Sequence, residues 1–257
     1  MSRWSRRRRS CVIGRLGVGL DNIDVPGCDA RGIDVIPATG ANAQAVAEYV
    51  ICTAMALLRG AYTRSSETAA GFWPRAQLSN GRKLAGKTLG LIGFGAIGCR
   101  TARLAQALGM FVIAHDPAIA IAAPLWQESG VTHRALVDVR AAADVVSLHV
   151  PLTDATRSLI DAAALAAMKE GAILINSARG GIVDEVPLAR ALRTGHLGGA
   201  ALDVFDDEPL PAGNALALAP NVILTPHIAG VTQESNRSVS ALIAERVAAS
   251  LKAMPAS

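Results

Sequence analysis

The sequence of 257 residues is poor in aromatic side chains, in charged residues and in long apolar runs. Phe, Trp and Tyr make up only 4% of it, so a core must be built from Ala, Val, Leu and Ile. Charged residues are 18% and hydrophobic residues 51%, a balance that excludes an intrinsically disordered chain. No apolar run reaches the ~18 residues of a membrane-spanning helix, so no membrane partner is expected. The length suffices instead for about two globular domains.

Cysteines are also few, and none forms a C-x-x-C pair. The four, Cys11, Cys28, Cys52 and Cys99, lie far apart in the sequence. This spacing favours neither a zinc site nor a disulfide scaffold. We therefore expect no metal and a reducing, cytoplasmic setting.

The net charge of +4 is concentrated at the amino terminus. Five arginines lie within residues 1–10, and the rest of the chain has 20 basic against 21 acidic side chains. The body is therefore nearly neutral, which does not support a nucleic-acid partner. The Arg-rich start lacks a following apolar stretch, so it is not a secretory signal. A short nucleic-acid patch and part of an organellar targeting peptide are the alternatives to the favoured interpretation, a disordered or wrongly assigned start.

From residue 84 onward, short apolar runs alternate with stretches of helical periodicity. The runs are residues 88–92, 111–114, 145–150, 172–175, 200–204 and 222–224. Strands that are apolar throughout and separated by helices are typical of a parallel sheet covered on both faces. With the right-handed crossover rule, the pattern predicts an α/β fold with a doubly wound parallel sheet, the Rossmann arrangement.

Other elements flank this sheet. Residues 11–13 and 33–36 are short apolar segments, and the Ala/Val/Leu-rich residues 42–58 predict a long helix buried on more than one side. Residues 60–86 are polar and irregular, as in a linker or an arm over a neighbouring subunit. Residues 238–251 predict a final helix.

Gly93, Gly95 and Gly98 form a G-x-G-x-x-G pattern directly after an apolar strand and at the start of a helix. Asp116 lies 18 residues beyond Gly98, at the end of the next predicted strand, which completes the dinucleotide-binding context. Gly93 permits the tight turn, Gly95 lets the backbone approach a pyrophosphate, and Gly98 allows close helix–strand packing.

The same pattern predicts which cofactor is bound. The amides of Ala96 and Ile97, at the helix N-terminus, would face the phosphates. Asp116 would accept hydrogen bonds from both ribose hydroxyls and would repel a 2′-phosphate. The predicted cofactor is therefore NAD rather than NADP.

Three polar residues follow the later strands, at the edge where an open parallel sheet binds ligands. Arg179, Glu208 and His227 each have an ordinary explanation when taken singly, as a surface charge or a structural histidine. Together, beside a dinucleotide site, they suit hydride transfer to a 2-oxo acid. The cation would hold the carboxylate and polarise the ketone, the histidine would donate a proton, and the glutamate would orient and stabilise the imidazolium.

Six stretches then match a known family in the family's own order. They are GRLGVGLDNIDV (14–25), residues 90–98, HVPL (149–152), NSARGGIVDE (176–185), LDVFDDEP (202–209) and TPHIAG (225–230). Over about residues 11–252, the chain resembles the D-isomer-specific 2-hydroxyacid dehydrogenase family, the phosphoglycerate dehydrogenase-like group. Residues 226–235 and 236–240 (PHIAGVTQES, NRSVS) further resemble sulfolactate dehydrogenase-like members.

The resemblance implies that Arg179, Glu208 and His227 are the catalytic set. It implies that the backbone amides of Val18 and Gly19 bind the substrate carboxylate, together with Arg179 and His227. It places Asp203 beside the nicotinamide carboxamide. Further cofactor contacts are implied at Val150, Pro151, Ala178, Arg179, His227 and Gly230.

A domain organisation is implied as well. Residues 1–10 are a disordered basic tail, and residues 11–41 are the remnant of a flavodoxin-like substrate-binding domain. Residues 42–231 form the NAD-binding domain, in which 42–86 are an interdomain helix and arm with a homodimer interface. Residues 232–257 return to the substrate domain. Because the family begins with most of a substrate domain before the GRLGVG stretch, we expect a truncated chain or an artefactual start.

The leading prediction is an NAD-dependent oxidoreductase that interconverts a small 2-hydroxy acid and its 2-oxo acid. The alternatives are an NAD-sensing, corepressor-like interaction protein and an NAD-binding but weakly active or inactive truncated homologue. Formate dehydrogenase-like members carry Gln where this chain has Glu208, which argues against formate. The sequence does not identify the acid, because the loops that read its side chain belong largely to the part of the family ahead of residue 14.

Overall fold

The computed structural model describes residues 11–20 and 22–253, so the predicted basic tail, residues 1–10, lies outside the described residues. The described chain divides into two compact units. One is Ala43–Gly230, and the other joins the described residues up to Asn42 with those from Val231 onward. The chain therefore passes between the units twice, after Asn42 and after Gly230.

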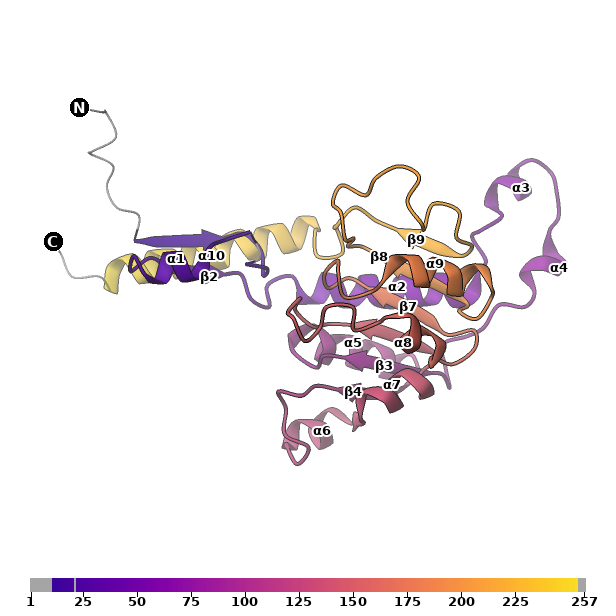
Figure 1. The fold of residues 1–257 in the computed structure, drawn as a ribbon, viewed down its shortest axis with the longest axis horizontal. Coiled ribbons are helices and arrows are strands. Elements are labelled where there is room, and N and C mark those ends of the chain that lie inside the picture. Colours follow the sequence, from indigo (N-terminus) through magenta and orange to yellow (C-terminus); the bar gives the residue numbers. More distant parts are fainter. Residues whose placement is uncertain (1–10, 21, 254–257) are drawn as a thin grey trace. The chain divides into compact units, whose positions relative to one another are not determined.

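The larger unit is built on a seven-stranded sheet in which all pairs of neighbouring strands are parallel (Figure 1). Its strands are β3 (Thr88–Ile92), β4 (Phe111–His115), β5 (Thr132–His133), β6 (Val145–Leu148), β7 (Ile173–Asn176), β8 (Gly199–Leu202) and β9 (Val222–Leu224). The order is β5-β4-β3-β6-β7-β8-β9. The chain reverses direction across the sheet between β3 and β6, and such switch points are where doubly wound sheets bind ligands.

Helices cover both faces of this sheet. One layer contains α2 (Ala43–Arg59), α5 (Ala96–Ala107) and α6 (Pro124–Ser129), and the other contains α7 (Leu136–Ala142), α8 (Ala162–Ala166) and α9 (Glu185–Arg193). Successive residues of β7 enter opposite layers, since Ile173 and Ile175 pack in the first and Leu174 in the second. All three are fully buried, as the continuous apolar run of a parallel strand requires. The predicted doubly wound parallel sheet is confirmed.

Helix α2 buries most of its circumference. Its exposed positions form one narrow stripe, which consists of Gln44, Glu48, Cys52, Met55 and Arg59. The rest of the helix packs against α5, β7 and β8, in agreement with the predicted burial on more than one side. The helix is therefore part of the core of the larger unit.

The segment predicted as irregular, residues 60–86, carries two short helices, α3 (Ser65–Ala69) and α4 (Arg75–Leu78). They lie on a loop that stands away from the sheet (Figure 1). Three aromatic side chains of this loop are exposed to solvent: Tyr62 by 75%, Phe72 by 67% and Trp73 by 79%. In a chain with so few aromatics, this is a large share of them on one segment.

The smaller unit consists of two parallel strands, β1 (Val12–Arg15) and β2 (Asp34–Pro37), with the short helix α1 (Val25–Asp29) and the long helix α10 (Gln233–Ala253). Helix α10 packs on the strands through Val239 and Ile243, which are buried with Ala38. That these elements are the remnant of a substrate-binding domain stays a prediction. Within residues 11–20 and 22–253, no helix combines the length and the apolar character needed to cross a membrane.

Candidate active site

The glycine-rich loop after β3 lies at the switch point of the sheet. Gly93 has φ of 97°, and a Cβ there would overlap the carbonyl group of His149, which follows β6. A Cβ at Gly98 would lie 2.6 Å from the carbonyl oxygen of Gly93, so the helix packs closely on the turn. At Gly95, by contrast, a Cβ would meet nothing within 4 Å. Of the three glycines, only Gly95, where a pyrophosphate is expected to approach the backbone, has no close neighbour.

Asp116, directly after β4, faces this loop. Its Oδ2 accepts a hydrogen bond from the amide of Phe94 (2.8 Å), and its Oδ1 accepts one from the amide of Ala118 (2.9 Å). Each carboxylate oxygen can accept a second bond. Helix α5 begins at Ala96, so the amides of Ala96 and Ile97 belong to its first turn, where backbone donors have no partner within the helix.

His149 ties β6 to the glycine-rich loop. Its amide donates to the carbonyl oxygen of Ile92 (2.7 Å), and its Nε2 lies 3.1 Å from Oγ of Ser147. Burial lowers the pKa of His149 to about 4. The imidazole is therefore neutral near pH 7 and acts as a structural link. Val150 and Pro151 follow it, and Val150 lies next to Gly93.

The three predicted catalytic residues lie on loops that follow neighbouring strands. Arg179 follows β7, Glu208 lies on the loop after β8, and His227 follows β9. Because β7, β8 and β9 are adjacent and parallel, their carboxyl ends meet at one edge of the sheet.

His227 and Glu208 are in direct contact. Nδ1 of His227 lies 2.8 Å from Oε2 of Glu208, and both side chains are partly exposed, by 51% and 38%. The other carboxylate oxygen accepts the amide of Phe205 (3.1 Å), which fixes its orientation. Since a carboxylate only accepts, Nδ1 carries the hydrogen, and Nε2 is the nitrogen left to exchange a proton with a ligand.

The loop of His227 is organised by Asp203. This buried carboxylate accepts hydrogen bonds from Oγ1 of Thr225 (2.6 Å) and from the amides of Ile228 (2.8 Å) and Ala229 (2.7 Å). The amide of His227 donates to the backbone oxygen of Asp203 (2.8 Å), and His227 itself has φ of 56°. No sequence pattern indicated this function of Asp203, because its partners are mostly backbone amides.

The Arg179 loop is fixed by a buried side chain that sequence reasoning missed. The side-chain amide of Asn176 donates to the carbonyl oxygen of Arg179 (2.9 Å), and its oxygen accepts the amide of Ala178 (3.1 Å). The next residue, Gly180, lies directly against the backbone of Phe205, so that a Cβ there would overlap the Phe205 carbonyl group. The loops of Arg179 and Glu208 therefore touch through their backbones.

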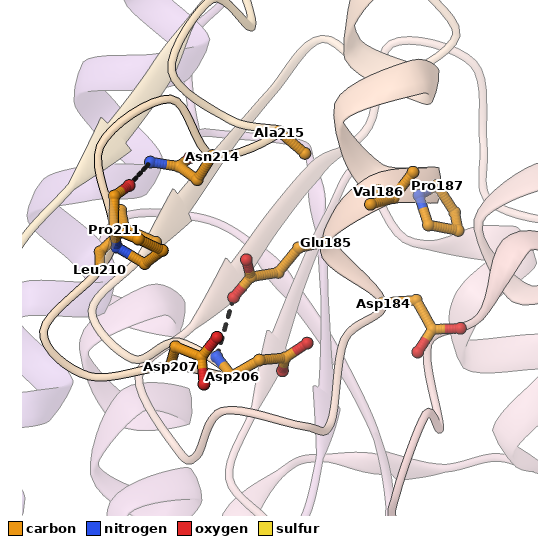
Figure 2. A pocket seen from close by; sticks show the side chains of 10 residues that line it. All are labelled: Asp184, Glu185, Val186, Pro187, Asp206, Asp207, Leu210, Pro211, Asn214 and Ala215. Atoms are coloured by element: carbon orange, nitrogen blue, oxygen red, sulfur yellow. Dashed lines mark hydrogen bonds between the residues drawn. The ribbon is translucent and has the colours of Figure 1, made fainter.

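A second link between these loops borders an acidic hollow of about 440 Å³ (Figure 2). Asp206 accepts the amide of Gly181 through Oδ1 (2.6 Å), and its own amide donates to Oε1 of Glu185 (2.9 Å). Burial raises the pKa of Glu185, and the charges of Asp206 and Asp207 raise it further against the opposing hydrogen bond. Among the described residues, no group of His, Cys, Asp and Glu side chains could hold a metal ion.

The remaining predicted positions are distributed over both units. Gly230 is the last residue of the larger unit, next to the buried Ala229. Val18 and Gly19 follow β1 in the smaller unit, and the Gly19 carbonyl oxygen accepts a hydrogen bond from Nε of Arg15 (3.2 Å). Their function in carboxylate binding stays a prediction.

Comparisons with known proteins bear on this arrangement. The family model described as "D-isomer specific 2-hydroxyacid dehydrogenase, NAD binding domain" matches residues 51–229, well over half of the chain. The (S)-sulfolactate dehydrogenase of Chromohalobacter salexigens is 53% identical over 236 residues, which are 92% of this chain and 76% of that protein. The D-3-phosphoglycerate dehydrogenase of Bacillus subtilis is 39% identical over 244 residues, 95% of this chain but only 46% of that protein.

Solved structures agree. A glyoxylate reductase from Paecilomyes thermophila has a TM-score of 0.85 and 33% identity, covering 94% of this chain and 72% of its own. The D-lactate dehydrogenase from Aquifex aeolicus, in complex with NAD and lactic acid, has a TM-score of 0.81 and 33% identity, covering 94% and 76%. The chain thus spans about three quarters of some relatives and under half of others.

These relatives confirm the predicted cofactor, NAD, and the predicted class, oxidoreductases that act on 2-hydroxy acids. The predicted family is confirmed on two independent grounds, the domain match and the level of identity. The chain belongs to the D-isomer specific 2-hydroxyacid dehydrogenase family.

Proposed function

We propose that this chain binds NAD and interconverts a small 2-hydroxy acid and its 2-oxo acid, with His227 as the general acid and base. The observation that carries the proposal is the 2.8 Å contact between Nδ1 of His227 and Glu208, on loops that meet at the carboxyl edge of the sheet. A histidine oriented by a carboxylate in this way is suited to proton transfer through its other nitrogen.

The residues around the glycine-rich loop suit a dinucleotide. Gly95 leaves room for the pyrophosphate, the first turn of α5 offers the amides of Ala96 and Ile97, and Asp116 retains acceptor capacity for the ribose hydroxyls. Asp203 uses three of its about four acceptor positions, so it can accept one more donor, such as a carboxamide. When bound, the nicotinamide supplies or accepts the hydride. We propose that Val150, Pro151, Ala178 and Gly230 line the same channel.

The chain's own residues would handle charge and protons. In 2-oxo acid reduction, Nε2 of His227 donates its proton to the ketone oxygen, and Glu208 stabilises the imidazolium beforehand. Arg179 holds the carboxylate and polarises the ketone. In the reverse direction, His227 takes the proton from the hydroxyl group.

The substrate we propose to test first is sulfolactate, because the sulfolactate dehydrogenase of C. salexigens is similar over nearly the whole chain. We would compare 3-sulfopyruvate with glyoxylate, pyruvate and 3-phosphohydroxypyruvate, the 2-oxo acids that correspond to the named relatives. Formate is expected to be inert, because the family resemblance implies Gln in formate dehydrogenases at the position of Glu208.

The decisive test is His227→Ala. We expect turnover to fall about 10²–10⁴-fold while the Kd for NADH changes little, because the imidazole moves a proton and contributes little to cofactor binding. His133→Ala is the matched control, since His133 lies on the edge strand β5. A His227→Ala protein with full turnover would remove His227 from the mechanism. NADH binding by the wild type with no turnover on any of the four acids would favour the sensing or inactive alternatives.

We also propose that the chain forms a homodimer through the arm of residues 60–86. Its support is the exposure of Tyr62, Phe72 and Trp73, which a second copy would cover. Light scattering should give twice the chain mass of 26.5 kDa, and Phe72→Ser with Trp73→Ser should shift the protein toward monomer. A monomeric wild type at micromolar concentration would refute this.

We also propose a cytoplasmic location for the protein. Its support is that all four cysteines are free thiols.

A further inference from the structure

A chain of hydrogen bonds connects helix α2 to the loop of His227. The hydroxyl of Tyr49, on α2, lies 2.7 Å from Oγ1 of Thr225, and Oγ1 of Thr225 lies 2.6 Å from Oδ1 of Asp203. The first two residues are 176 positions apart in the sequence. The contact is therefore created by the fold alone.

The direction of each bond follows from the chemistry of the groups. Both oxygens of Asp203 already accept backbone N–H groups, so its carboxylate acts as an acceptor. The single hydrogen of the Thr225 hydroxyl must then go to Asp203. Tyr49 is left as the donor to Thr225. Burial raises the pKa of Tyr49, and the charge of Asp203 raises it further against the opposing bond to Thr225, which keeps the phenol protonated.

This series of hydrogen bonds ends at the loop of His227. The two other bonds of the Asp203 carboxylate go to the amides of Ile228 and Ala229, immediately after His227. We infer that Tyr49 and Thr225 are positioning residues that hold the Asp203 carboxylate, and through it the loop that aims His227. The inference rests on the proposed function of His227 in turnover.

The position of these hydrogen bonds in the fold explains how they could hold the His227 loop. Helix α2 starts at Ala43, where the chain enters the larger unit, and the His227 loop ends at Gly230, where it leaves. Val50 and Ala54, on the buried side of α2, are fixed in the core of that unit. Tyr49 thus anchors a loop at one connection to a rigid helix at the other connection.

The experiment compares four variants: Thr225→Val, Thr225→Ser, Tyr49→Phe and Thr53→Val. Thr53 is the matched control, because it is a buried hydroxyl one turn further along α2 that bonds only to carbonyl oxygens of its own helix, those of Tyr49 and Val50. For each variant we would measure kcat, KM and the solvent deuterium isotope effect, using NADH and whichever of the four 2-oxo acids turns over fastest. Amide hydrogen exchange of residues 226–230 would be followed by mass spectrometry.

We expect Thr225→Val to lower kcat about 10-fold, since partial misplacement of a catalytic group is costly. Tyr49→Phe should lower it about fivefold, the equivalent of one ordinary hydrogen bond. KM for the acid should stay within about twofold of wild type, the solvent isotope effect should rise, and residues 226–230 should exchange faster. Thr225→Ser, which restores the hydroxyl, should recover the wild-type values. A mere loss of folded protein would leave the isotope effect unchanged.

The inference is overturned if Tyr49→Phe and Thr225→Val match the wild type, or if Thr53→Val loses as much kcat as Tyr49→Phe. If the wild type turns over none of the acids, the proposed function fails, and exchange alone decides the inference. Faster exchange of residues 226–230 in Thr225→Val and Tyr49→Phe than in Thr53→Val then supports it, and equal exchange overturns it.

Discussion

A single methyl group at position 180 should separate the loops that carry Arg179 and Glu208. A Cβ at Gly180 would overlap the carbonyl group of Phe205 and lie 2.9 Å from the amide nitrogen of Asp206. All of these are backbone atoms, so none can rotate away as a side chain would. Gly180→Ala therefore has to move one loop relative to the other.

The size of the displacement sets the expected loss. Non-bonded carbon atoms approach other heavy atoms to about 3.5–4.0 Å, so the loops must part by roughly 1 Å or more. A misplacement of ~1 Å at a catalytic group can lower the rate ~10²-fold. We expect kcat/KM for the 2-oxo acid to fall about 10²-fold. The Kd for NADH should rise much less than kcat/KM falls, because Gly95 and Asp116 follow β3 and β4, on the other side of β6, and only the proposed contact at Ala178 lies on a displaced loop.

The assay is steady-state reduction of the best 2-oxo acid with NADH, together with NADH binding by fluorescence. Gly213→Ala is the matched control. Gly213 lies in the same β8–β9 connection as Phe205, with φ of 74°, and a Cβ built there would meet nothing within 4 Å. The Gly213→Ala protein should lose about 1 kcal/mol of stability and no activity. If Gly180→Ala kept kcat/KM within threefold of wild type, the backbone contact would not position the two catalytic loops.

Two further predictions follow from buried or partly buried carboxylates. Asp116→Ala should weaken NADH binding and narrow the preference for NADH over NADPH at least about 10-fold, because a charged acceptor is lost. An unchanged ratio of the kcat/KM values for the two cofactors would contradict the assignment of Asp116 to the ribose hydroxyls. For Asp144, burial alone would raise the pKa, but the bonds from Lys169 and the Thr88 amide and the charges of two lysines outweigh burial and lower it. Its stabilisation is therefore present above the ordinary Asp pKa of about 4 and lost as pH falls through the lowered value. In urea unfolding at pH 7, Asp144→Asn should be about 1.5–3 kcal/mol less stable than wild type, and the two free energies of unfolding should converge in acid. A difference in stability that stays constant with pH would show that ionisation of Asp144 does not contribute to stability.

The sheet could be predicted because its strands are apolar on both faces. The predicted ranges of β3 and β9 match the structure, and the other predicted strands of the larger unit differ from it by one or two residues at one or both ends. Strand β5 was missed, since Thr132–His133 has no apolar run and pairs only at the sheet edge. Helix α10 begins five residues before the predicted start at 238. Its first turns are polar, and Thr232 caps them through reciprocal bonds with Ser235 that the apolar period does not reveal.

The candidate site divides along a similar line. Residues that follow strands, such as Arg179, Asp116 and His227, could be found because a parallel sheet gathers its carboxyl ends. The residues that hold them could not. Asn176 lies one residue beyond the predicted strand 172–175, and its bonds to Ala178 and Arg179 depend on the exact backbone path of the turn. The contact between Tyr49 and Thr225 joins segments far apart in the chain, so it depends on tertiary geometry that a local pattern does not encode.

The left-handed backbone conformation of His227 lowers the stability of the protein, whereas its side chain is proposed to serve turnover. A φ of 56° costs a residue with a Cβ about 1–2 kcal/mol, whereas glycine adopts it freely. His227→Gly should therefore be about 1 kcal/mol more stable than His227→Ala, although both lack the imidazole. Selection for thermal stability alone would accordingly favour glycine at this position and would produce a more stable but inactive protein. On the proposed function, proton transfer is what the histidine provides in return for this backbone cost.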